Sequence, residues 1–159
     1  MDISSDYTFH STVDITIEDG DAEDIETQAA TVYALSSPII VHDTSVHISG
    51  TCYKAYGVYL PNRDTWISDL DININITGSG YNTSCYGYGI YASAYYGGVM
   101  PAVLKSTAIS VITTDTGDTR YTEYGKDAHA YAYGIDTDTR NWTPADADVT
   151  VSVSASAIS

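Results

Sequence analysis

Two kinds of short segment alternate along the chain, and no other feature limits its possible folds so strongly. One kind, rich in Tyr, Ala and Gly, occurs at 30–35, 55–60, 87–92 and 132–136. The other kind, rich in Ile and Val, occurs at 13–17, 46–50, 70–78, 108–112 and 148–155. The centres of the first kind lie 26, 32 and 45 residues apart, at Val32, Val58, Ile90 and Ile135. A short unit that recurs in this way is typical of proteins built from stacked repeats.

The Ile/Val segments alternate with a period of two, which predicts strands. From Leu70 to Ile76 every second side chain is Leu or Ile, and polar residues lie between them. Such alternation gives a strand one apolar and one polar face. Thr, Ile, Tyr and Val make 62 of the 159 residues, and β-branched and aromatic side chains favour strands. The sequence therefore predicts an all-β fold and argues against all-α and doubly wound α/β folds.

We expect a single domain over residues 1–159, folded as a two-sheet β-solenoid of about four to five coils. Each coil would contribute one Tyr/Gly strand to one sheet and one Ile/Val strand to the other. The alternative is an antiparallel β-sandwich, in which the same strands pair as hairpins. The segments between the strands exceed the two residues of a tight hairpin, which favours the solenoid.

The first and last strands of this fold are expected to be open. Residues 149–159 contain no Lys, Pro or Gly, the residues that usually protect the edge of a sheet. We expect the last strand of one copy to pair with the first strand of the next and to continue both sheets, giving a ring or filament. A fragment cut from a larger solenoid would have the same open edges. The expected interface residues are Val13, Ile15, Ile17, Val149, Val151 and Val153.

The charge of the chain excludes some partners. There are 21 acidic and 6 basic residues, a net charge of −15, and so negative a surface repels phosphate backbones. The longest apolar runs are only a few residues, so we expect neither a nucleic-acid partner nor membrane insertion. Scarce Lys and Arg, abundant Ser and Thr, and three Asn-x-Ser/Thr sequons favour an extracellular location. The candidate glycosylation sites are Asn75, Asn82 and Asn141.

The two cysteines, Cys52 and Cys85, precede Val58 and Ile90 by six and five residues. They therefore occupy nearly the same place on successive coils, at about the separation that a disulfide needs. We predict a disulfide within the subunit, with a bridge between subunits as the second possibility. Two buried free thiols are the remaining alternative.

Carboxylates are the only candidate metal ligands of note. Residues 18–26 carry six of them, and calcium prefers several oxygen ligands around a flexible loop. The candidate ligands are Asp19, Asp21, Glu23 and Asp24, although no cofactor is required by the fold. Neither a nucleophile elbow nor a zinc spacing accompanies the histidines, so we predict no enzymatic activity.

Tyrosines recur along the Tyr/Gly segments and would stack into aromatic ladders if the strands are in register. Strict alternation places Tyr33, Tyr59 and Tyr91 on one face and Tyr56, Tyr88 and Tyr133 on the other. An inward ladder would be part of the core. An outward ladder would pack against another filament or bind sugar rings.

The repeated Ala-Tyr-Gly-Val-Tyr and Gly-Tyr-Gly-Ile-Tyr-Ala segments and the Val-x-Ile-x-Gly segments over 30–157 resemble the repeats of secreted adhesin-like β-solenoid proteins of microbial cell envelopes. A narrower resemblance is to the structural protein of the tubular sheath around some filamentous methanogenic archaea. These resemblances imply a structural protein that polymerises with itself and has no enzymatic activity. The competing expectation is a carbohydrate-binding or adhesive β-solenoid module, whose exposed tyrosine face would contact glycans.

Overall fold

The computed structural model describes residues 11–17, 31–36, 40–61, 66–78, 84–93, 103–116, 128–137 and 148–157. Nearly all of these residues lie in strands, as the Ile, Val, Thr and Tyr content predicts. The strands are β1 (Ser11–Ile17), β2 (Thr31–Ser36), β3 (Ile40–Thr51), β4 (Lys54–Pro61), β5 (Trp66–Gly78), β6 (Ser84–Ser93), β7 (Val103–Asp115), β8 (His129–Thr137) and β9 (Val149–Ala157).

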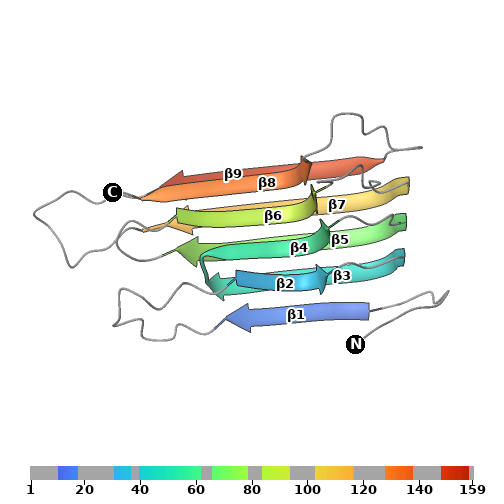
Figure 1. Cartoon of the computed structure of the whole chain (residues 1–159), viewed down its shortest axis with the longest axis horizontal. Coiled ribbons are helices and arrows are strands. Elements are labelled where there is room, and N and C mark those ends of the chain that lie inside the picture. Colours follow the sequence, from blue (N-terminus) through green and yellow to red (C-terminus); the bar gives the residue numbers. More distant parts are fainter. Residues whose placement is uncertain are drawn as a thin grey trace, which may run out of the picture.

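The strands form two sheets, and successive strands along the chain belong to different sheets. One sheet has the order β1-β3-β5-β7-β9 and the other the order β2-β4-β6-β8. Figure 1 shows the four-stranded sheet lying in front of the five-stranded one. All strand pairings between the described residues are parallel. The all-β prediction is confirmed, and the antiparallel sandwich is wrong.

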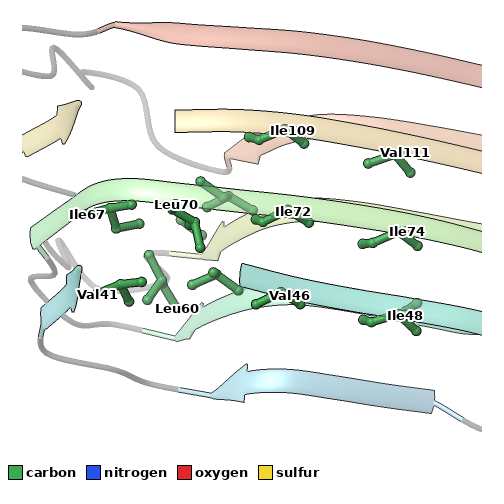
Figure 2. Packing of buried hydrophobic residues seen from close by; sticks show 14 of the residues in the cluster. Val41, Val46, Ile48, Leu60, Ile67, Leu70, Ile72, Ile74, Ile109 and Val111 are labelled. Atoms are coloured by element: carbon green, nitrogen blue, oxygen red, sulfur yellow. The ribbon is translucent and has the colours of Figure 1, made fainter. Parts of the chain in front are cut away.

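The register of the five-stranded sheet places equivalent apolar residues beside one another. Val46 pairs with Ile72, and Ile72 pairs with Ile109. These side chains point between the two sheets and are at most 3% exposed, as Figure 2 shows for β3, β5 and β7. The polar residues between them, such as Asn73 and Asn75, face solvent. The period-two pattern therefore gave the correct faces for these strands.

In the four-stranded sheet, the first repeat is shifted relative to the expectation. Tyr33 pairs with Tyr56, and Leu35 pairs with Val58, so Leu35 and not Val32 is the equivalent of Val58. The two central residues are thus 23 positions apart instead of 26. The prediction matched Val32 with Val58 because both are valines in similar segments. In the structure the register instead places Tyr33 beside Tyr56, where the two rings stack.

Glycines of the four-stranded sheet allow the two sheets to approach closely. A Cβ atom at Gly57 would lie 2.7 Å from the carbonyl oxygen of Gly89 and 2.8 Å from Cγ2 of Ile72. Both distances are too short for any side chain. Large Ile side chains on one sheet therefore pack against glycine backbone on the other, and the core is thin and dense.

The long strands of the five-stranded sheet bend at equivalent positions. Asp43, Asp69 and Ser106 have φ angles of 46°, 51° and 47°, in the left-handed region that L-residues seldom adopt. Just after two of these residues, Thr44 and Thr107 donate hydrogen bonds from their hydroxyl groups to the carbonyl oxygens two residues earlier, at 3.0 and 3.1 Å. The bend separates the first residues of β3, β5 and β7 from the flat part of the sheet.

Candidate functional site

The edges of the two sheets are the first candidate site. β1 and β9 are the outer strands of the five-stranded sheet, and β2 and β8 are the outer strands of the four-stranded sheet. An edge strand presents a row of unpaired backbone N–H and C=O groups, which can template the addition of another strand. Within their bounds these four strands contain no Lys, Arg or Pro, and β2 and β9 contain no charged residue. The charged side chains that usually protect an exposed edge are therefore missing from β2 and β9.

The inner face of β9 is only partly covered. Val151 and Val153 pair with Ile109 and Val111 of β7 and continue the same rows of core residues. Nevertheless they are 46% and 51% exposed, whereas Ile109 and Val111 are 3% and 0% exposed. Val149, the first residue of β9, is half-buried against the core. At the opposite edge of the sheet, Val13, Ile15 and Ile17 of β1 are also half-buried against the core. The six residues expected at the interface thus lie on the two opposite edges of one sheet.

The strand count corrects one part of the expected interface. The described residues form five strands in one sheet and four in the other. For these strands, pairing β9 of one copy with β1 of the next would continue only the five-stranded sheet. The expectation that both sheets continue through this pairing is wrong, because β8 and the β2 strand of the next copy would be two strand spacings apart.

The outer face of the four-stranded sheet carries a ladder of tyrosines, the second candidate site. The rings of Tyr33, Tyr56, Tyr88 and Tyr133 stack in sequence across all four strands, with centroids 5.0, 4.8 and 4.8 Å apart and interplanar angles of 3°, 13° and 5°. The ladder is covered in its middle and open at its ends. Tyr56 and Tyr88 are buried, whereas Tyr33 and Tyr133 are 46% and 36% exposed.

The expected division of these tyrosines between two faces is wrong. Tyr59 lies 5.3 Å from Tyr56, and Tyr91 lies 5.4 Å from Tyr88, measured between ring centroids. Tyrosines three residues apart therefore share the outer face. Gly57 and Val58 are both buried, which breaks the alternation between the two tyrosines.

A further tyrosine row on the same face was missed. Tyr86 stacks on Tyr131 with centroids 4.7 Å apart, and the edge of Tyr53 meets Tyr86 at 5.4 Å. The Lys54 ammonium lies 5.1 Å from the centroid of Tyr86, within the range of a cation–π interaction. The repeated Tyr-x-Tyr-Gly spacing at 86–89 and 131–134 is the signal that would have revealed this row.

Packing raises the pKa values of Tyr56 and Tyr88, the two central phenols of the ladder. Burial is the largest cause for Tyr88, whose pKa it raises to about 12 with a contribution from neighbouring Tyr133. Burial and the adjacent Tyr88 likewise raise the pKa of Tyr56. These two phenols therefore remain neutral far into the alkaline range.

The two cysteines do not form the predicted disulfide. Cys52 and Cys85 are both buried free thiols, the remaining alternative from the sequence. Lys54 pairs with Tyr86, so the position opposite Cys85 is Tyr53, and the two cysteines are one residue out of register. The Cys85 thiol lies 3.7 Å from the carbonyl oxygen of Cys52, as a weak donor to it. Burial raises the pKa of Cys52 to about 11 and that of Cys85 to about 12, which makes both unreactive.

The predicted calcium ligands Asp19, Asp21, Glu23 and Asp24 lie outside the described residues. Within the described ranges, no group of three or more His, Cys, Asp or Glu side chains is placed to hold a metal ion. Of the glycosylation candidates, Asn75 is exposed on the outer face of β5, whereas Asn82 and Asn141 lie outside the described residues. In the described part of the chain there is also no helix with the length and apolarity needed to cross a membrane.

One cluster resembles catalytic chemistry only in its residue types. Nδ1 of His42 lies 2.7 Å from Oγ of Ser68 and 3.1 Å from a carboxylate oxygen of Asp69. A catalytic triad needs the serine on one ring nitrogen and the carboxylate on the other, but here both face the same nitrogen. The cluster links the bent ends of β3 and β5 and does not have the geometry of an activated nucleophile.

In comparisons with known proteins, no family model, curated protein or solved structure matches the chain.

Proposed function

We propose that the chain is a two-sheet β-solenoid of four to five coils that polymerises through its terminal strands into extracellular structural material. The polymer would be a sheath, tube or fibre of a cell envelope, in keeping with the resemblance of the repeats to envelope solenoids. The observation that carries the proposal is the partly covered edge at β9, where Val151 and Val153 are about half exposed on a strand without charged residues.

An exposed edge of this composition is costly for a protein that remains a monomer. Burying a valine side chain fully contributes about 1.5–3 kcal/mol, and roughly half of that is unrealised at Val151 and at Val153. Unpaired edge strands with high β-propensity and no charge also aggregate. Addition of a second copy would bury both valines and pair the backbone, so the same features become an interface.

The tyrosine ladder supports a structural role better than glycan binding. Sugars stack on the faces of aromatic rings, but in this ladder the faces of Tyr56 and Tyr88 are covered by the neighbouring rings. A continuous row of stacked rings instead holds four strands in register. We therefore place the carbohydrate-binding or adhesive module second, with dispersed protein binding to a glycan array as its test.

Electron microscopy of three proteins tests the proposal. The wild-type chain is expected to form filaments or tubes as its concentration rises. Val153→Lys introduces a charge on the exposed inner face of the β9 edge and should abolish assembly. The matched control is Ile112→Lys, because Ile112 is 40% exposed on the same sheet but lies on the interior strand β7. This control should assemble as the wild type does.

Circular dichroism should show strand signal in both variants, so that loss of assembly is separated from loss of folding. Wild-type protein that remains dispersed at every concentration and salt level would refute the proposal.

Calcium at the acidic segment 18–26 belongs to the same proposal, because it would reduce repulsion between copies of net charge −15. Loss of order when EDTA is added to assembled material is the expected result.

A further inference from the structure

The number of strands determines how successive copies must be oriented if they stack. The nine strands of the described residues alternate between two sheets, so the described part of one copy contributes four and a half pairs of strands. In Figure 1, the arrows of β1 and β9 point the same way, and those of β2 and β8 point the opposite way. The strands of one sheet thus run opposite to those of the other. This inference rests on the proposed function, since it concerns the geometry of the polymer.

Stacking without rotation leaves a gap. If β1 of the next copy lies beside β9, its β2 lies on the four-stranded side, two strand spacings from β8. The separation would be about 10 Å, against about 4.8 Å for paired strands. Two rows of backbone groups would then remain unpaired around an empty strand position at every junction, which is unfavourable once the junction is buried.

Stacking with a half-turn about the stacking axis removes the gap. A half-turn exchanges the positions of the two sheets and reverses the direction of every strand. β1 of the next copy then lies beside β8 and runs parallel to it, and β2 lies beside β9 and runs parallel to it. Both sheets continue without interruption, and every junction has the parallel pairing that is found throughout the described sheets.

We propose that copies of this chain stack head to tail with a rotation of about half a turn, with β8 paired to β1 and β9 paired to β2 of the next copy. Each strand neighbour at the junction is then the second strand after it in sequence order, as within one copy. One repeated contact then covers both ends of the stack of strands, the β1/β2 end and the β8/β9 end. Two-fold symmetric contacts would instead need two different interfaces, one for each end.

The inner side chains of β9 fit this arrangement. In the middle of the fold a row of Ile residues faces glycines, but after a half-turn β9 would face the inner Val and Ile side chains of β1. Two rows of large side chains do not fit between the sheets, so one of the two facing strands needs smaller inner residues. β9 has them, because Val151, Ala155 and Ala157 stand where β7 has Ile109, Thr113 and Asp115.

The charges permit the pairing of β9 with β2. Neither strand contains a charged residue, so this contact brings no like charges together despite the net charge of −15. The half-turn contact also places β1, which carries Asp14, beside β8, which carries His129 as well as Asp136. The unrotated contact of β9 with β1 brings no like charges together either, so the strand count and not the charge distinguishes the two arrangements.

Helical reconstruction of the filaments by electron cryomicroscopy tests the orientation. The half-turn predicts a rise of about 22 Å per copy, four and a half strand spacings, with a rotation near 180°. Unrotated stacking predicts about 24 Å, five spacings in the longer sheet, with a rotation near zero. The second result would overturn this inference and leave the proposed function intact. A closed tail-to-tail dimer, or no assembly, would overturn both.

Disulfide crosslinking gives an independent readout in solution. Thr31, Thr12 and Ser152 are exposed on β2, β1 and β9 respectively. Ser152→Cys combined with Thr31→Cys should give a ladder of covalent multimers on a non-reducing gel, and Thr150→Cys or Ser154→Cys in place of Ser152→Cys covers other registers. The same three β9 positions combined with Thr12→Cys should give at most dimers. A multimer ladder only with Thr12→Cys would overturn the inference.

Discussion

Gly57→Ala should unfold the protein more readily, because there is no room for a methyl group between the sheets. The added Cβ would lie 2.7 Å from the carbonyl oxygen of Gly89 and 2.8 Å from Cγ2 of Ile72, which is 0% exposed. Overpacking of a well-packed core costs about 1–3 kcal/mol. We expect about 3 kcal/mol here, since a backbone atom must move as well as a side chain. With a urea m-value of about 2 kcal/mol/M, the unfolding midpoint falls by about 1.5 M.

Urea titration followed by far-UV circular dichroism at low ionic strength, where the acidic copies repel, measures this loss. Gly134→Ala is the matched variant, because its Cβ would meet only the half-exposed side chain of Val151. Adding Val151→Ala should restore most of the loss at Gly134. Adding Ile72→Ala should not restore Gly57→Ala, because the Gly89 carbonyl stays in place. An unchanged midpoint for Gly57→Ala would refute the close approach of the sheets.

Three further outcomes follow from the packing. Because the folded chain holds the pKa of Tyr88 at about 12, above the usual value near 10, this phenol stabilises the fold fully below pH 10. That stabilisation is lost as the pH rises from about 10 to about 12, so urea midpoints should fall over this range, and less so in Tyr88→Phe. Cys52 and Cys85 should resist iodoacetamide in the folded protein and react at once in urea, since both are buried thiols; rapid labelling of the native chain would contradict their burial. Ile74→Ala should cost about 2–5 kcal/mol in urea unfolding because Ile74 is 0% exposed, whereas Ile112→Ala, on the solvent face, should cost less than about 1 kcal/mol; equal losses would contradict the assigned faces.

The sequence predicts the Ile/Val strands well because their alternation is not interrupted. In β5 each residue from Leu70 to Ile76 has the burial that a period of two assigns to it. The repeats alone left the relative direction of the strands open, and the structure shows that the pairings between the described strands are parallel. Local pattern and tertiary packing agree in these strands, so one signal was sufficient.

The Tyr/Gly strands were harder to predict because packing against the other sheet overrides their local pattern. Gly57 is required by the approach of Ile72 from a different strand, and no local rule reveals that contact. The resulting break in alternation brings Tyr56 and Tyr59 to one face. The disulfide prediction was wrong for a related reason. A shift of one residue in strand register decides whether two sulfur atoms can meet, and the spacing of the cysteines in the sequence does not define the register to one residue.

The two outer faces of the described strands differ in chemistry, with stacked tyrosines on one side and mostly short polar residues such as Asn73, Ser110 and Ser152 on the other. If successive copies turn by half a revolution, neither flank of the filament is uniform. Each flank becomes striped, with an aromatic band and a hydrophilic band exchanging every 22 Å or so. Two neighbouring filaments shifted by one band would then place aromatic bands against aromatic bands. A wall of such filaments would expose the same alternation of aromatic and hydrophilic bands on both of its surfaces.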